Sequence, residues 1–136
     1  KFHMNDVCAT VGIENLKHVN DIISKHRDNA AYYDKQLQNI KGVTLLERNS
    51  LCNSAFWIYT MLVDDRDSFY KYMDKCNISV SQVHERNDKH TCVKEFSTQL
   101  PNLDKTIGKV VNIPVGWWVT EEEREYIVNC IKKGWQ

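Results

Sequence analysis

The densest group of polar side chains in this 136-residue sequence lies between Val83 and Cys92. Within that stretch, Arg86 offers the two-pronged donor geometry that binds carboxylate or phosphate groups. His84 and His90 could donate hydrogen bonds to anionic oxygens, or change charge near neutral pH. The pattern predicts a site for an anionic ligand or, as the plain alternative, a solvated charged loop.

The same stretch also contains residue types that bind zinc. His84, His90 and Cys92, with Cys52 added, could supply nitrogen and sulfur ligands. Structural zinc ligands usually come in pairs two to four residues apart, and this spacing does not match. We therefore expect no metal site. The sequence has no Ser-His-Asp order, P-loop or GxGxxG motif, so no motif by itself predicts a catalytic residue.

The elements that position this loop alternate in an α+β pattern. Apolar residues at steps of three and four predict a long helix from Asn5 or Asp6 to about Gln38, bent or divided at Gly12. Thr120 and Glu123 form a capping box that opens the last helix, which Gly134 ends. Between them we expect strands at 43–46, 55–63, 78–83 and 110–113, and helices at 66–76 and 101–109.

This pattern predicts a long N-terminal helix and a small, mostly antiparallel sheet covered by helices. The cap of the helix at 66–76 is expected from Asp64 and Asp65, and its end from a left-handed Asn77. Phe56 and Trp57 are predicted core residues of the second strand. The indoles of Trp117 and Trp118 are predicted to plug the core or, alternatively, to form a pocket wall.

Composition narrows the possible partners. Lys plus Arg and Asp plus Glu number 18 each, so no net charge attracts nucleic acid or an anionic membrane. No apolar run is long enough to span a bilayer, and no signal-peptide pattern is present. Five scattered cysteines without a CxxC spacing indicate reduced thiols. We expect a soluble, cytoplasmic protein, and because Lys1 almost directly precedes a helical pattern, a piece of a longer one.

Four segments in order resemble one known family. The first begins Lys-Phe-His-Met-Asn-Asp and continues into a helix with small residues, and the others follow at similar relative places. They are 1–16, 54–59, 83–90 and, together with 100–102, 112–120. This set is similar to the DegT/DnrJ/EryC1/StrS family of sugar aminotransferases. The resemblance implies the C-terminal domain of a fold-type-I aminotransferase, with residues 1–40 leading from a large domain and residues 41–136 forming the small one.

The resemblance also implies chemistry that this chain cannot complete alone. Family members use pyridoxal phosphate bound to a lysine that precedes the segment matched here, so no covalently bound cofactor is expected on this chain. Lys1 aligns with a position that reaches the cofactor phosphate of a neighbouring subunit. His3 stands where many members have arginine. His84, Arg86 and His90 fall on the substrate-facing loop, with Arg86 as the candidate contact to a phosphate or a ring hydroxyl.

Two functions are consistent with this reading. The first is part of a homodimeric enzyme in amino-sugar biosynthesis, which transfers an amino group from glutamate to a nucleotide-linked keto-deoxysugar. In that case the chain packs against a large domain and helps to close the sugar site. The alternative is a stand-alone binding or dimerisation module without catalysis.

Overall fold

The computed structural model describes residues 3–135, and Lys1 lies outside them. Two helices open the chain, α1 (Asp6–Leu16) and α2 (Val19–Gln36). The Asn5 side chain caps α1 by accepting the Cys8 N–H at 2.8 Å. Gly12 lies within α1, so the division predicted there is wrong in position. The break falls at Lys17 and His18, whose N–H groups bond three residues back, to Glu14 and Asn15, at 3.2 and 3.0 Å.

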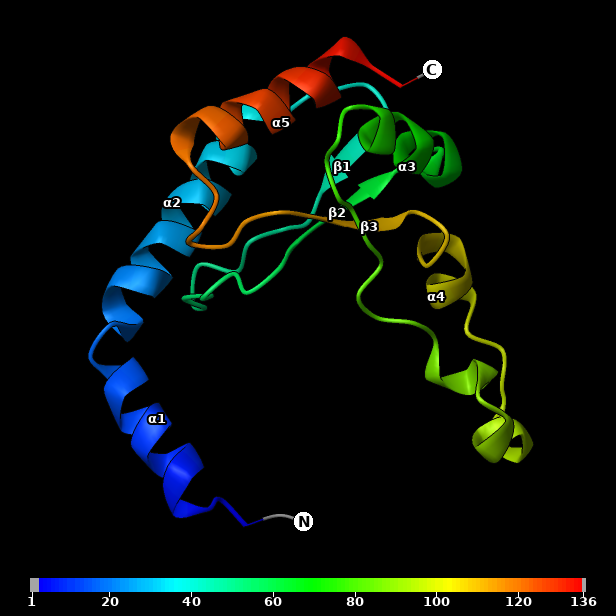
Figure 1. Cartoon of the computed structure of the whole chain (residues 1–136). Coiled ribbons are helices and arrows are strands. Elements are labelled where there is room, and N and C mark those ends of the chain that lie inside the picture. Colours follow the sequence, from blue (N-terminus) through cyan, green and yellow to red (C-terminus); the bar gives the residue numbers. More distant parts are fainter. Residues whose placement is uncertain (1–2, 136) are drawn as a thin grey trace.

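A three-stranded antiparallel sheet forms the centre of the molecule (Figure 1). Its strands are β1 (Val43–Leu45), β2 (Tyr59–Val63) and β3 (Val110–Ile113), in the spatial order β1-β2-β3. Val43 pairs with Val63, and Tyr59 pairs with Ile113. Alternate residues of β2 are buried, as expected for a strand with one face on the core. The predicted α+β fold with a small antiparallel sheet is confirmed.

The strand predicted over 55–63 is wrong in its first half. Phe56 has a φ of 50°, which interrupts the extended backbone, and β2 begins only at Tyr59. Trp57 is 67% exposed instead of buried, while the Phe56 ring packs against the edge of the core. The strand predicted over 78–83 is reduced to one bridge, between Ser81 and Asn112.

Three further helices follow the first pair. They are α3 (Arg66–Lys75), the short α4 (Pro101–Thr106) and α5 (Glu121–Lys133). Asp65 caps α3 through the Ser68 N–H at 3.0 Å, and Asn77 has a φ of 57°, so both predicted ends are confirmed. The capping box of α5 is confirmed as well, because both of its reciprocal hydrogen bonds are present. None of the helices within residues 3–135 is long and apolar enough to cross a membrane.

The core lies where α2, α3 and α5 meet the sheet. Its largest fully buried side chains are aromatic or aliphatic, and they come from all four of these elements: Tyr33, Leu37, Tyr59, Met61, Phe69, Met73 and Ile131. The Tyr33 and Tyr59 rings meet edge to face at 5.1 Å, and Trp135 meets Phe69 in the same way at 5.0 Å. Burial raises the pKa of both Tyr33 and Tyr59, so these phenols stay protonated.

A buried asparagine joins α2 to the turn that precedes α5. The Asn29 amide nitrogen donates to the carbonyls of Val115, at 3.2 Å, and Gly116, at 3.1 Å, and its oxygen accepts from Arg124 at 3.2 Å. The turn then carries two exposed indoles, since Trp117 and Trp118 are 55% and 63% exposed. Their prediction as core plugs is therefore wrong, whereas the alternative of a pocket wall is confirmed for Trp118, which lines a cavity of about 400 Å³. The Trp118 ring lies directly against Gly116, in the space that a Cβ there would fill.

Candidate substrate-binding loop

The loop predicted over 84–99 is present as two short turns of 3-10 helix. These are η1 (Asn87–Lys89) and η2 (Thr91–Phe96), which lie at the end of an arm that leaves the sheet and returns through α4 (Figure 1). The Asn112 side chain of β3 fixes the start of this arm. It accepts the Val83 N–H at 2.9 Å and donates to the Thr60 hydroxyl at 2.7 Å. The arm therefore leaves the sheet in a defined register.

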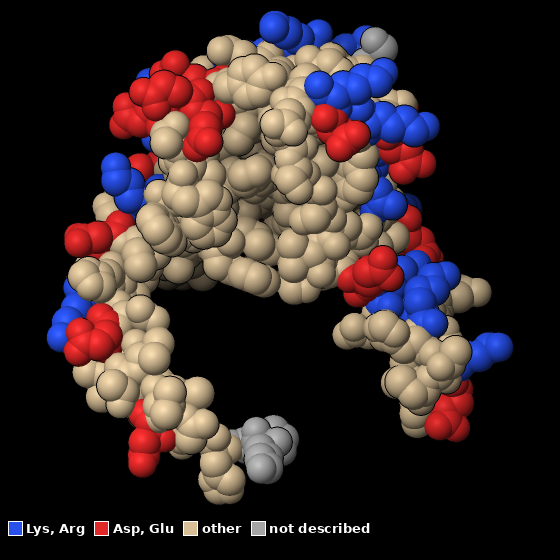
Figure 2. Space-filling model, in the orientation of Figure 1, with Lys and Arg blue, Asp and Glu red and all other residues tan. Residues whose placement is uncertain are grey.

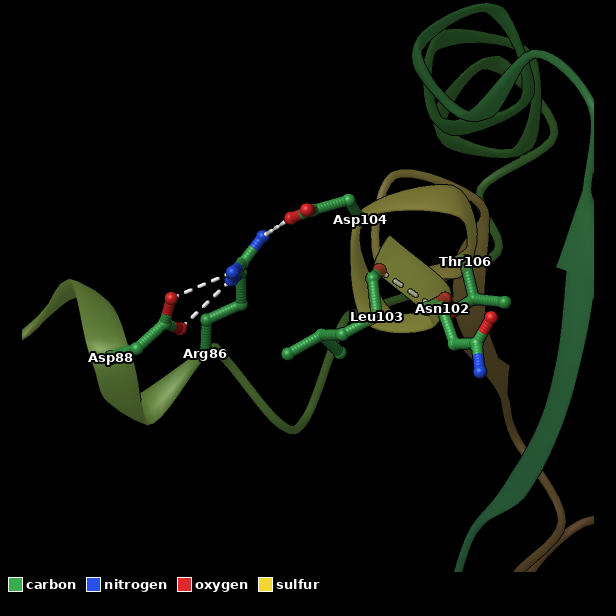
Figure 3. Close-up of polar contacts among 6 residues, drawn as sticks. All are labelled: Arg86, Asp88, Asn102, Leu103, Asp104 and Thr106. Atoms are coloured by element: carbon green, nitrogen blue, oxygen red, sulfur yellow. Dashed lines mark hydrogen bonds and ion pairs between the residues drawn. The ribbon is translucent and has the colours of Figure 1, made fainter. Parts of the chain in front are cut away.

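Arg86 is the central polar residue of the arm, and its guanidinium binds two carboxylates (Figure 3). Its Nε and Nη2 donate to the two oxygens of Asp88, at 2.8 and 2.6 Å. Its Nη1 donates to Asp104 at the start of α4. These two carboxylates raise the pKa of Arg86, and Arg86 lowers the pKa of Asp88. The three side chains, which we call the Arg86 clamp, tie the outgoing part of the arm to the returning part.

The clamp limits what Arg86 can do for a ligand. The side chain is only 13% exposed. Three of its five N–H groups are engaged with carboxylates, whose negative charges oppose the approach of a phosphate. The geometry therefore suits a residue that holds the loop in place. The prediction that Arg86 contacts a phosphate or a ring hydroxyl remains a prediction.

The two histidines of the arm are both exposed to solvent. The His84 ring lies 6.2 Å from the ring of Trp57, which belongs to the segment between β1 and β2. The backbone N–H of His90, just after η1, donates to the Asn87 carbonyl at 3.2 Å. No hydrogen bond or ring contact joins the side chains of His84, Arg86 and His90 in the described part of the chain. The three candidates therefore share one arm without converging on one point.

Cationic side chains meet at the base of the arm around a cavity of about 160 Å³. Arg66, Arg86 and Lys89 line it together with Gln82 and Glu85. Arg66 donates to the Ile107 carbonyl at 2.9 Å and to the Gln82 side chain, so it braces the base of the arm. Two of the three cations are therefore already bound within the protein. Neither here nor elsewhere in residues 3–135 could a group of three His, Cys, Asp or Glu side chains hold a metal ion.

Sequence reasoning missed three residues of this region. Asp88 stands two places after Arg86, a spacing that could have suggested the pair. Asp104 lies 18 residues from Arg86, and nothing in the sequence indicates that contact. Trp57 was expected inside because it belongs to the apolar stretch predicted as a buried strand, but the left-handed backbone at Phe56 interrupts that strand.

The arm and α1 enclose a wide hollow beneath the sheet. Figure 2 shows that side chains around this hollow are mostly uncharged, while the charged ones gather on the outer surfaces. Apolar side chains of α1 are more than half exposed, namely Val7, Val11, Ile13 and Leu16, and Phe96 of η2 is also exposed. Exposed apolar side chains gathered on one element in this way are typical of a surface that another protein segment covers.

The same architecture occurs in solved aminotransferases. The chain superposes with a TM-score of 0.96 on AtS13 from Actinomadura melliaura, with 42% identity over 99% of this chain and 36% of that one. The sugar aminotransferase CalS13 from Micromonospora echinospora also gives a TM-score of 0.96, with 43% identity over 99% of this chain and 37% of its own. The fold is therefore that of one part of a sugar aminotransferase.

The sequence comparison identifies the family. The model of the DegT/DnrJ/EryC1/StrS aminotransferase family matches residues 1–132, and the chain belongs to this family. The dTDP-4-amino-4,6-dideoxy-D-glucose transaminase of Escherichia coli is 31% identical over 80 residues, which are 55% of this chain and 22% of that protein. EryC1 of Saccharopolyspora erythraea is 20% identical over 136 residues, or 96% of this chain. The chain spans 37% of the length of EryC1.

Proposed function

We propose that this chain is the C-terminal part of a pyridoxal-phosphate-dependent aminotransferase that acts on a nucleotide-linked keto-deoxysugar. The observation that carries the proposal is the 43% identity to the sugar aminotransferase CalS13 over 99% of the chain. The identity to a transaminase of a dTDP-linked dideoxysugar supports the same substrate class. Glutamate is the proposed amino donor. The five free cysteines favour a reducing compartment, so we propose the cytoplasm.

We propose that none of the lysines within residues 3–135 holds this cofactor covalently. None of them is buried, and Lys109, which is half-buried, pairs with Asp64 at 2.9 Å. Pyridoxal phosphate supplies an electron sink when a lysine holds it as an imine. We propose that this lysine belongs to a large domain outside the chain. Lys1, proposed to reach the cofactor phosphate of a partner subunit, lies outside the described residues.

The apolar residues of the exposed helix α1 suggest that two other protein surfaces pack against it. None of its residues is buried, and its apolar side chains point in two directions. Val7 and Val11 are four residues apart and share one face, while Ile13 and Leu16 share another. A helix that is apolar on two faces suits a place between two bodies. We propose that the large domain covers one face and a second subunit of a homodimer covers the other.

We propose that the arm over 84–99 is the part of the small domain that closes the sugar-nucleotide site. His84 and His90 are exposed donors on it and are the proposed substrate contacts. Arg86 is proposed to act mainly through the clamp, by holding these donors in place. In this proposal the helices of residues 1–40 connect the small domain to the large one. Residues 41–136 form the small domain, which includes the arm.

The test uses the longest protein that the gene encodes, purified with pyridoxal phosphate. We expect visible absorbance from the bound cofactor and conversion of glutamate to 2-oxoglutarate that depends on a dTDP-linked 4-keto-6-deoxysugar. Substitution of the predicted upstream lysine by alanine should abolish both signals. A protein without a large domain, or one that binds the cofactor without transferring an amino group, would contradict the proposal and favour the non-catalytic module.

A further inference from the structure

The backbone at Phe56 is held in a costly conformation. Its φ of 50° lies in the left-handed region, which a bulky side chain seldom adopts. A strained residue of this kind persists only when its surroundings fix it, and such residues gather at functional sites. The effect of this one is visible in the chain, because it turns the next side chain, Trp57, out of the core alternation and into solvent.

Several contacts from distant parts of the sequence fix this conformation. Nδ1 of the buried His26 bonds to the Phe56 carbonyl at 2.7 Å, and the Phe56 N–H donates to the Ser54 hydroxyl at 3.1 Å. Arg27, next to His26 on α2, donates to the Ser54 carbonyl at 2.9 Å. The Arg48 guanidinium lies 5.0 Å from the centre of the Phe56 ring. The segment that presents Trp57 is therefore rigid, although it has no regular structure.

The exposed indole lies beside the proposed substrate-binding arm. The Trp57 and His84 rings are 6.2 Å apart and inclined by 59°. They come from two different connections, the one between β1 and β2 and the one that leaves the Ser81–Asn112 bridge. In Figure 1 both connections extend from the sheet toward the side of the hollow. The two rings form an exposed aromatic pair at the root of the arm.

We propose that the Trp57 indole stacks on the nucleobase of the nucleotide-linked substrate, while His84 donates to the adjoining phosphate. This inference rests on the proposed function and adds the residue that holds the base. The pair offers a flat, 67% exposed indole and one ring N–H, which match a planar base joined to an anion. A pyranose can also place its C–H face on an indole, and the titration below distinguishes the base from the sugar. Stacking on an aromatic ring tolerates different bases, because each base has a π-face.

The test is a calorimetric titration of the full-length enzyme with thymidine diphosphate and, separately, with glucose 1-phosphate. Removing one stacked ring weakens binding by about 5- to 150-fold, so we expect a Trp57→Ala change of that size for thymidine diphosphate. Trp57→Phe keeps a ring and should retain most of the affinity. Trp117→Ala is the matched control, since Trp117 is 55% exposed but contacts Trp118 instead of His84. Glucose 1-phosphate should bind all variants equally.

Three outcomes would overturn the inference. The first is equal affinity of Trp57→Ala and Trp117→Ala for thymidine diphosphate. The second is a Trp57→Ala protein that melts at a lower temperature with unchanged affinity, which would mean that another part of the enzyme covers the indole. The third is a loss confined to glucose 1-phosphate, which would assign the indole to the sugar. Amino transfer measured in the same wild-type enzyme decides the proposed function separately, so failure of Trp57 alone leaves it standing.

Discussion

The body of the molecule and its two arms are stabilised in different ways. The body, made of the sheet with α2, α3 and α5, contains all the fully buried side chains among residues 3–135. We now use the word arm for two segments. One is α1, and the other is the substrate-binding arm over 84–99 together with the returning helix α4. None of the four helices α1, η1, η2 and α4 has a buried residue. Figure 1 shows both arms reaching away from the sheet.

The arms keep their form through local polar contacts. Asn5 caps α1, the Glu14–Lys17 pair lies near its end, and the Arg86 clamp joins the outgoing and returning halves of the other arm. Exposed contacts such as the Glu14–Lys17 pair contribute little to the free energy of unfolding, and the less exposed Arg86 clamp acts within its own arm. The difference indicates that the body folds by burying its own side chains, whereas the arms are shaped to meet something else.

The largest expected difference in the free energy of unfolding comes from an isoleucine-to-alanine substitution made once in the body and once in α1. Ile131 is fully buried in α5, and Ile13 of α1 is 62% exposed. Ile131→Ala should lower the free energy of unfolding by about 2–5 kcal/mol, because it leaves a cavity. Ile13→Ala should change it by less than about 0.5 kcal/mol, because no packed neighbour is lost. Urea unfolding of the 136-residue chain, followed by circular dichroism, measures both.

The substitutions Ile131→Ala and Ile13→Ala can also be made in the longer protein, where they test whether another domain covers α1. If a large domain covers α1, Ile13→Ala should become costly there while Ile131→Ala keeps its effect. Equal costs of the two substitutions in the 136-residue chain would contradict the division into body and arms.

Removing a helix cap should also destabilise the body more than α1, but by a smaller amount. Thr120→Ala removes half of the capping box of α5 and should cost about 1 kcal/mol of global stability, whereas Thr120→Ser should be nearly neutral. Asn5→Ala removes an equivalent cap from α1 but should only fray that helix. Thermal melting reports the first effect, and hydrogen exchange of the Cys8 amide reports the second. A lower melting temperature of Asn5→Ala would show that α1 unfolds together with the body.

The smallest effect on global stability is expected from the Arg86 clamp, which should act on its own arm. Arg86 lowers the pKa of Asp88 below its ordinary value. A carboxylate with a lowered folded pKa stabilises the fold above the unfolded pKa of about 3.9, and this contribution is lost as the pH falls through the folded value. The arm should therefore stay ordered at neutral pH and loosen only below about pH 4.

Nuclear magnetic resonance of the Asn87, Asp88 and Lys89 amides measures this loosening. Arg86→Ala should loosen the arm at every pH, with little change in the melting temperature. Lys17→Ala breaks an ion pair of similar length, 2.6 Å, on the other arm, and should leave these amides unchanged. If the resonances of these amides are the same in Arg86→Ala as in the wild type, the clamp does not hold the arm in place.

The predictable parts of the fold are those with local causes. Asp65, Asn77 and Thr120 act within about three residues of a helix end, so their chemistry is legible in the sequence. The break between α1 and α2 was expected at Gly12 because glycine favours a break, but α1 accommodates it. The tighter turn at Lys17 and His18 carries no such signal.

The parts that could not be predicted depend on contacts between distant residues. His26 lies 30 positions before Phe56, yet its bond to that backbone helps to delay the start of the strand until Tyr59 and to expose Trp57. The arm was recognisable as a polar loop from its composition. Its internal order was not, because the contact between Arg86 and Asp104 forms only after α4 returns beside it.

The close approach of Trp118 to Gly116 means that substitutions at these two positions depend on each other. Any side chain at position 116 would occupy the space of the indole, so a gene that acquires alanine there must also lose or move the tryptophan. Replacement of Trp118 by a small residue removes that restriction on position 116. Because the Trp118 indole is 63% exposed, it can also turn aside into solvent, so alanine at position 116 displaces the indole and leaves the backbone of the turn in place.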